Sequence, residues 1–142
     1  MPDRYAIAAA TFYDELAQKL IDGARSVFEE AGHEVDVVEV PGCFELPMAA
    51  KICAETGRYK GVACCGAVIR GETDHYDYVC GEAARGIMDV QLNTGVPCGF
   101  GVLTVDSYDQ ALARLGPKRH QGEDAARAVL ALALIANGKW RS

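Results

Sequence analysis

His75 has the side chain best suited to proton transfer in this sequence, because imidazole gains and loses a proton near neutral pH. It stands where a loop meets the start of a predicted helix, close to Thr73, Asp74 and Asp77. This setting suits a group that donates and accepts a proton during a reaction. An ordinary surface histidine near a helix start has the same local sequence, so these residues alone leave both interpretations open.

The segment before His75 is suited to bind an anion. Thr73 and the backbone N–H groups around Gly71 and Glu72 precede the helix, whose amino end carries free N–H groups and a partial positive charge. A phosphate can bind there, although a threonine at this place is also an ordinary helix cap. The segment lacks the Gly-Lys-Thr/Ser ending of a P-loop and the G-x-G-x-x-G of dinucleotide folds, which argues against a nucleoside triphosphatase or a dehydrogenase.

Three aromatic and two charged residues extend the candidate set. Phe12, Phe44 and Phe100 lie at or near the ends of predicted strands, where a ring can stack on a flat heterocycle or simply cover the core. Glu45 can accept hydrogen bonds from hydroxyl groups or favour the dipole of its helix. Arg114 can bind a phosphate through both arms of its guanidinium or remain a solvated helix charge.

Apolar periodicity places these residues on strands and helices that alternate along the chain. Strands are predicted at residues 5–10, 34–40, 61–69 and 98–103. Helices are predicted at residues 13–31, 44–56, 107–115 and 123–137, and a long one runs from a cap at residue 73 or 74 to about residue 94. The alternation predicts an α/β protein, a parallel sheet between helices in a three-layer α/β/α sandwich. No repeat or linker divides it, so residues 1–142 are expected to form one domain.

A sheet of this kind binds its ligand beyond the carboxyl ends of the strands. Four loops are predicted to meet there, at residues 11–13, 41–45, 70–76 and 104–108. The candidate residues collect mainly in the first three of these loops, so the fold prediction and the chemical prediction converge on one place.

Composition excludes several function classes. The net charge is −6, with 20 acidic and 14 basic residues, whereas nucleic-acid binding calls for a basic face. The longest apolar stretch, residues 125–136, is too short to cross a bilayer. The first residues lack the apolar core and cleavage site of a secretory signal, so we expect a cytoplasmic protein. The six cysteines show no Cys-x-x-Cys pair, which favours reduced, buried thiols over disulfides or a zinc site.

Two longer motifs resemble signatures of the lumazine synthases. VPGCFELP at residues 40–47 resembles V-P-G-x-x-E-[IL]-P, and GAVIRGETDHYDYV at residues 66–79 resembles G-x-x-I-R-G-x-T-x-H-[FY]-[DE]. Residues 11–12, 100–104, 110–111 and 122–126 follow in the order and spacing of that family. The resemblance runs from about residue 5 to residue 137, which is almost the whole chain.

The resemblance implies a flavodoxin-like, four-stranded parallel sheet of order 2-1-3-4. It implies a homopentamer, or a higher assembly of pentamers, whose active sites are shared between neighbouring subunits. The implied activity is a transferase reaction of riboflavin biosynthesis. It condenses 5-amino-6-(D-ribitylamino)uracil with 3,4-dihydroxy-2-butanone 4-phosphate to give 6,7-dimethyl-8-ribityllumazine, phosphate and water. No cofactor or metal is expected, and riboflavin synthase is a possible partner protein.

The family's site residues carry over onto matching positions of this sequence. His75 would be the proton donor and acceptor. The pyrimidine and its ribityl chain would contact Phe12, Cys43, Phe44, Glu45, Ala67, Val68, Ile69 and Phe100. The sugar phosphate would be held by Glu72, Thr73 and Arg114, with Phe100 and Arg114 supplied by the adjacent subunit. Gln121 departs from the family pattern, because many members have lysine there and so one more positive charge near the phosphate.

Two other function classes could use the same loops. One is a flavodoxin-type protein that binds a flavin without turnover, but this leaves His75 and Arg114 without a role. The other is a pentameric scaffold that has lost its activity, to which Gln121 would be the clue. The intact Gly-x-Thr-x-His run at residues 71–75 has little use in a scaffold, so catalysis is the preferred hypothesis.

Overall fold

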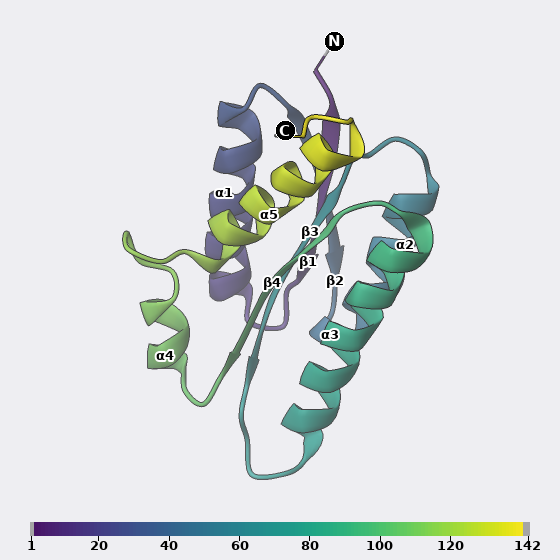
Figure 1. Cartoon of the computed structure of the whole chain (residues 1–142). Helices are drawn as coiled ribbons and strands as arrows, with labels where there is room; N and C mark the ends of the chain where they lie inside the picture. Colours follow the sequence, from purple (N-terminus) through teal and green to yellow (C-terminus); the bar gives the residue numbers. More distant parts are fainter. Residues whose placement is uncertain (1, 141–142) are drawn as a thin grey trace.

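Four parallel strands form one sheet in the order β2-β1-β3-β4, as expected from the family resemblance. The computed structural model of the chain describes residues 2–140. Its strands are β1 (Arg4–Ala10), β2 (Glu34–Val40), β3 (Val62–Ile69) and β4 (Cys98–Val105). Every neighbouring pair is parallel, so all four carboxyl ends meet at one edge of the sheet, at the lower end of Figure 1.

Helices cover both faces of this sheet, which confirms the three-layer α/β/α sandwich (Figure 1). On one face lie α1 (Asp14–Glu30) and α5 (Gln121–Ala136). On the other lie α2 (Leu46–Glu55) and α3 (His75–Thr94). The short α4 (Tyr108–Ala113) follows β4 at the carboxyl edge. None of the helices within residues 2–140 is long and apolar enough to cross a membrane.

The sheet separates two apolar layers, because successive side chains of a strand point to opposite faces. Along β1, Ile7 packs in the layer that holds Phe28 of α1. The next residue, Ala8, packs in the layer that holds Leu46 of α2. Both faces of the central strands are therefore buried, which explains why β3, and β1 after Arg4, are apolar instead of alternating.

The ends of α1 and α3 follow capping rules that can be read from the sequence. Gly32 closes α1 as predicted. Its backbone has φ +87°, and the N–H of the next residue, His33, bonds to the carbonyl of Phe28 at 3.0 Å, an arrangement that glycine makes without strain. At the start of α3 the predicted cap is partly corrected. Thr73 Oγ1 accepts the backbone N–H of His75 at 3.3 Å, whereas Asp74 makes no side-chain cap bond.

Three other predicted boundaries shift in the structure. The predicted helix at residues 44–56 begins with a separate 3₁₀ turn, η1 (Cys43–Glu45), because the N–H of Glu45 bonds back three residues to the carbonyl of Gly42. Strand β4 continues to Val105, where it still pairs with the end of β3. Helix α5 begins at Gln121, since the ring of His120 accepts the backbone N–H of Glu123 and caps it.

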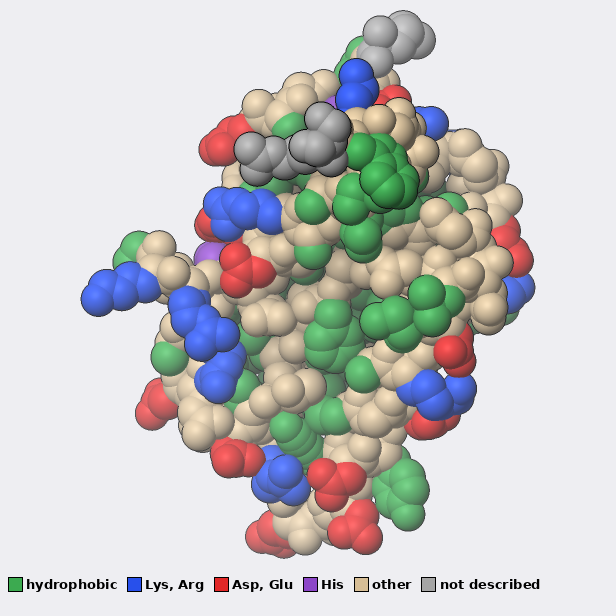
Figure 2. All heavy atoms as spheres, viewed as in Figure 1, with side chains coloured by type: hydrophobic (Ala, Val, Ile, Leu, Met, Phe, Trp, Pro, Cys, Tyr) green, Lys and Arg blue, Asp and Glu red, His purple; other side chains and the backbone are tan. Residues whose placement is uncertain are grey.

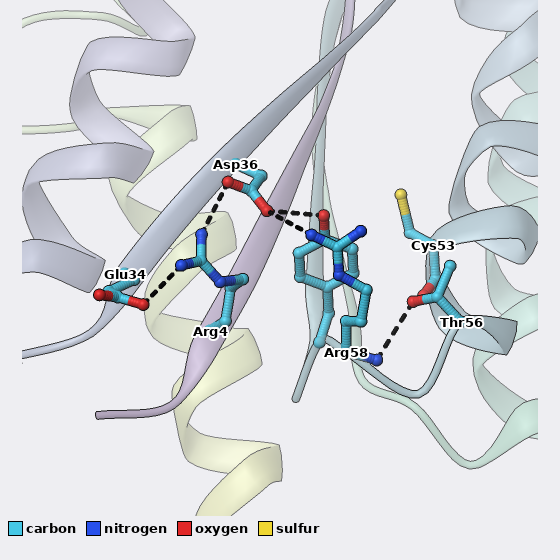
Figure 3. Close-up of polar contacts among 7 residues, drawn as sticks. Arg4, Glu34, Asp36, Cys53, Thr56 and Arg58 are labelled. Atoms are coloured by element: carbon cyan, nitrogen blue, oxygen red, sulfur yellow. Dashed lines mark hydrogen bonds and ion pairs between the residues drawn. The ribbon is translucent and has the colours of Figure 1, made fainter. Parts of the chain in front are cut away.

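A cluster of ion pairs ties the edge strand β2 to the sheet at its amino end (Figure 3). The Asp36 carboxylate accepts hydrogen bonds from Arg4 of β1 at 2.8 Å and from the Tyr59 hydroxyl at 2.7 Å. Arg58 lies 3.9 Å from the same carboxylate, and Arg4 also pairs with Glu34. Because this cluster lies at the opposite end of the strands, it leaves the carboxyl edge open for a ligand.

The contact between α1 and α5 depends on a glycine, which gives a prediction. A Cβ on Gly122 would overlap the backbone carbonyl of Leu20 in α1, so Gly122→Ala must separate the two helices. We expect the free energy of unfolding to fall by about 1–3 kcal/mol, measured by urea denaturation at one protein concentration. Gly81→Ala in α3, where the added methyl meets open space, is the control. It should raise stability by about 0.5–1 kcal/mol, and equal effects of the two variants would contradict the helix contact.

Candidate active site

A cavity of about 440 Å³ opens at the carboxyl edge of the sheet. Its walls come from the loop between β1 and α1, the turn η1, the end of β3 and the first turns of α3. The residues that line it are Phe12, Tyr13, Gly42, Cys43, Phe44, Glu45, Ala67, Val68, Ile69, His75 and Val79. Eight of the predicted site residues thus lie around one cavity, although they come from three distant segments of the chain.

Two exposed aromatic rings stand at this cavity. The side chains of Phe12 and Phe44 are 75% and 58% exposed, which leaves large apolar surfaces in water. The ring of Phe12 also contacts that of Tyr13 edge-to-face, with 4.9 Å between centroids. Covering such rings with a flat molecule removes their apolar surface from water and lowers the free energy. The cavity is therefore suited to a planar heterocycle.

The inner wall is apolar and closely packed. Cys43 is buried, and its thiol points to the carbonyl oxygen of Ala67 at 3.7 Å. A Cβ on Gly66 would lie 2.7 Å from the Cys43 sulfur, so only glycine at this position lets η1 approach β3 so closely. Burial, assisted by the neighbouring Cys80 thiol, raises the pKa of Cys43 to about 12. At neutral pH Cys43 is a neutral part of the wall and not a nucleophile.

Glu45 brings a carboxylate to the same cavity. Its Oε1 accepts the backbone N–H of Gly42 at 3.0 Å, which holds the side chain beside the turn η1. The residue remains exposed to solvent. A carboxylate fixed in this way can accept further hydrogen bonds from the hydroxyl groups of a bound ligand.

His75 is the first residue of α3 and faces the cavity. It is exposed, and within residues 2–140 its ring makes no hydrogen bond. The backbone N–H groups of residues 71–74, which precede it, also have no hydrogen-bond acceptor in the described chain. These groups stand at the positive end of the helix dipole. The structure thus places a titratable ring beside a set of donors that suits an anion, in the loop that holds Glu72 and Thr73.

Two predicted site residues lie away from this cavity. Phe100 pairs with Cys64 near the start of β4, towards the opposite end of the sheet, and is 36% exposed. The family resemblance implies that Phe100 completes the site of an adjacent subunit and not that of its own chain. Arg114 follows α4, where its guanidinium donates to the carbonyl of Gln110 at 3.2 Å. Basic side chains gather along that side of the molecule in Figure 2.

The cavity also contains residues that the sequence did not single out as site residues. Tyr13, Gly42 and Val79 all line it. Val79 stands four residues after His75 on α3, and residues at this spacing share one face of a helix. That spacing was the available signal for Val79, while Tyr13 and Gly42 are direct neighbours of predicted residues. Among the described residues no group of three or more His, Cys, Asp or Glu side chains is arranged to hold a metal ion.

Comparison with known proteins gives a consistent result. The family model of 6,7-dimethyl-8-ribityllumazine synthase matches residues 3–137. The protein with that name from Salinibacter ruber is 45% identical to this chain, over 93% of this chain and 87% of the relative. The one from Thermococcus gammatolerans is 48% identical, over 92% of this chain and 85% of the relative. The one from Novosphingobium aromaticivorans is 45% identical, over 96% of this chain and 98% of the relative.

The buried thiol in the cavity wall gives a prediction on pH dependence. The pKa of Cys43 is about 12 in the fold, against 9.0 for an unperturbed thiol, so above pH 9 the unfolded chain binds fewer protons than the folded one. The free energy of unfolding must then fall as pH rises, by up to about 1.4 kcal/mol per pH unit from this group. Cys43→Ala should remove this part of the slope in urea denaturation between about pH 9 and about pH 10.5.

The matched control is Cys53→Ala, since burial also raises the pKa of the Cys53 thiol but Cys53 is not one of the groups that shift the pKa of Cys43. Its effect on the slope should be smaller than that of Cys43→Ala. If Cys43→Ala had the same slope as the unmodified chain, the thiol would not be protonated and buried as described.

Proposed function

The chain belongs to the 6,7-dimethyl-8-ribityllumazine synthase family, and on this basis we propose how its residues carry out the family's reaction. The reaction condenses 5-amino-6-(D-ribitylamino)uracil with 3,4-dihydroxy-2-butanone 4-phosphate to give 6,7-dimethyl-8-ribityllumazine, phosphate and two waters. The observation that carries the assignment of the site is the single cavity that joins eight of the predicted residues. It offers a surface for a flat ring next to donors for an anion.

The pyrimidine lies between the exposed rings and the apolar wall. Phe12 stacks on it, and Phe44 covers its other side. The backbone of residues 67–69 at the end of β3 meets the ring edge, while Cys43 supplies a neutral surface behind it. Glu45 accepts hydrogen bonds from the ribityl hydroxyls. Support for this placement comes from the cavity lining and from the exposure of both rings.

The sugar phosphate binds at the start of α3. The unpaired N–H groups of residues 71–74, together with the Thr73 hydroxyl, surround its phosphate. Glu72 contributes its main chain to this cradle. Arg114 of the adjacent subunit adds a positive charge. The second substrate then lies directly beside His75, which is the geometry that joining the two substrates requires.

The enzyme acts mainly by holding the substrates together. The pyrimidine amine is already a nucleophile, so imine formation needs chiefly orientation, which contributes up to about 7–11 kcal/mol in favourable systems. Phosphate then leaves with its electron pair as His75 moves a proton at the neighbouring carbon. Arg114 and the amino end of α3 stabilise the departing charge. Every step uses groups of the protein and its substrates, so no cofactor or metal is required.

The complete site is shared between subunits of a homopentamer, or of a higher assembly of pentamers. Phe100 and Arg114 then reach the cavity of a neighbour. Support comes from apolar side chains that are exposed in the single chain, among them Met88, Leu92 and Leu132. Figure 2 shows hydrophobic side chains in the middle of the face between α5 and α3. The protein works in the cytoplasm as one domain over residues 1–142, with riboflavin synthase as a possible partner.

The test of the function is product formation by the purified protein. Lumazine absorbance and fluorescence should grow faster than the spontaneous reaction when both substrates are mixed with it. His75→Ala should lower the rate by up to about 100-fold, at the lower end of what a positioned proton carrier contributes, while the assembly stays intact in sedimentation. A rate equal to the uncatalysed background would reject the enzyme, and yellow absorbance of the isolated protein would indicate a flavin-binding protein instead.

The shared site gives a separate prediction for Arg114. Arg114→Ala should raise KM for the sugar phosphate about tenfold or more, since a charged hydrogen bond is lost, and should leave KM for the pyrimidine nearly unchanged. Mixing unfolded His75→Ala and Arg114→Ala chains and refolding them together should restore part of the activity measured at a sugar-phosphate concentration below KM, because some interfaces then combine two intact halves. Absence of any restoration would place Arg114 outside a shared site.

Gln121→Lys is the informative companion variant. It should lower KM for the sugar phosphate.

A further inference from the structure

Arg70 joins three segments at the carboxyl edge of the sheet. It follows directly after β3, and its Nε donates to Asp106, in the turn after β4, at 3.0 Å. Its Nη1 lies 3.6 Å from Asp77 in the first turn of α3. Its guanidinium carbon lies 4.2 Å from the centre of the Tyr76 ring. One side chain therefore connects the end of β3, the start of α3 and the turn that leads to α4.

The loop between Arg70 and His75 has few other attachments. Residues 71–74 are all exposed. Their hydrogen bonds run only to residues of α3, from His75 to Thr73 Oγ1 and from Asp77 and Tyr78 to the carbonyl of Asp74. Within residues 2–140 no hydrogen bond or ion pair fixes this loop to the rest of the sheet. The position of this loop next to His75 consequently depends on the groups at its two ends, and Arg70 links those ends.

The same contacts continue towards Arg114. The backbone N–H of Asp106 donates to the Gln110 side-chain oxygen at 2.7 Å. The backbone carbonyl of Gln110 accepts the Arg114 guanidinium at 3.2 Å. A continuous series of hydrogen bonds thus runs from Arg70 through the turn after β4 and α4 to the arginine assigned to the sugar phosphate of a neighbouring subunit.

The charge of Arg70 is already compensated. Two carboxylates lie within 4 Å of its guanidinium, and the hydrogen bond to Asp106 raises its pKa above the ordinary value. A guanidinium that binds two partners and stacks on a ring uses its planar fork, for which lysine is no substitute. This arrangement suits a residue that holds other groups in place, whereas a direct phosphate ligand would present its charge without such partners.

We propose that Arg70 is a positioning residue. It holds the start of α3 in place by joining Asp77, Tyr76 and Asp106, and so it positions His75 at the cavity and the N–H groups of residues 71–74 next to His75. The inference rests on the proposed function for its effect on turnover, but its effect on the order of the loop is independent of any reaction. The rival explanation is that Arg70 contacts the sugar phosphate directly.

Variants of the two carboxylate partners separate the two explanations, because the positioning role predicts impaired turnover and the direct-binding role predicts unchanged or tighter binding of the sugar phosphate. If Arg70 positions the loop, Asp106→Asn and Asp77→Asn weaken its anchors and lower kcat in the same direction as Arg70→Gln. If Arg70 binds the phosphate, removing either negative charge leaves the sugar-phosphate KM unchanged or lowers it. Arg85→Gln is the matched control, since Arg85 also pairs with two carboxylates but only within α3.

The experiment measures kcat and both KM values for the unmodified protein and for Arg70→Gln, Arg70→Lys, Asp77→Asn and Asp106→Asn. We expect kcat to fall about tenfold in Arg70→Gln, because misplacement by about 1 Å can cost up to 10²-fold, and Arg70→Lys to restore little of it. The double variant Arg70→Gln/Asp106→Asn should be no slower than Arg70→Gln alone, since both changes break one connection. The thermal midpoint should hardly move, since exposed ion pairs add little stability.

Hydrogen exchange of the same variants provides the readout that does not need turnover. The hydrogen-bonded amides at the start of α3, those of His75, Asp77 and Tyr78, should exchange several-fold faster in Arg70→Gln and Asp106→Asn than in the unmodified protein and in Arg85→Gln, while the strands stay protected. Unchanged exchange, or unchanged kcat in Arg70→Gln, would overturn the proposal. A lower sugar-phosphate KM in Asp106→Asn would favour direct binding. If the unmodified protein made no product, the proposed function would fail, and exchange would still decide whether Arg70 orders the loop.

Discussion

Hydrogen bonds between parallel strands determine where every functional group of this protein can lie. The register pairs Ala10 with Val40 and Ile69 with Val105, so β1 ends level with β2 and β3 ends level with β4. All four strands run in one direction, so their loops meet at one edge. Parallel strands need helical crossovers, which bury both faces of the sheet. The faces are therefore occupied by α1, α5, α2 and α3, and the carboxyl edge is the place left for a ligand. The ion pairs of Asp36 fasten β2 at the other end.

Within that frame, small residues decide how closely the walls approach. Gly66 leaves room for the Cys43 sulfur and for Ala10, which brings η1 against β3 and closes the inner side of the cavity. Gly99 and Gly122 allow α5 to lie directly on β4 and α1. A methyl group on Gly66 would push η1 away from β3, and one on Gly99 or Gly122 would push α5 away from β4 or α1. The cavity is thus a consequence of close packing, and its depth depends on residues that have no chemistry of their own.

The site divides its work between a fixed wall and an exposed loop. The wall is apolar, buried and uncharged at neutral pH, which suits a flat ring. The loop at residues 71–74 offers N–H groups that have no acceptor among residues 2–140, next to His75, which suits a phosphate and a proton transfer. Because unpaired groups remain in water until the substrate arrives, the loop cannot be held by burial and needs a side-chain anchor. Arg70 supplies that anchor with contacts on both sides of the loop.

The sequence by itself determined the strands, the helices and eight residues of the cavity, because periodicity, caps and turn residues act over a few neighbours and the two motifs are continuous. Only the tertiary structure decided the 3₁₀ turn at Cys43–Glu45 and the placing of Val79 in the cavity. The hydrogen bond from Arg70 to Asp106 joins residues 36 positions apart in the chain, and no periodic pattern in the sequence predicts it. Such contacts arise when strands pair and helices pack, so they depend on the whole chain, whereas local patterns depend on neighbours alone.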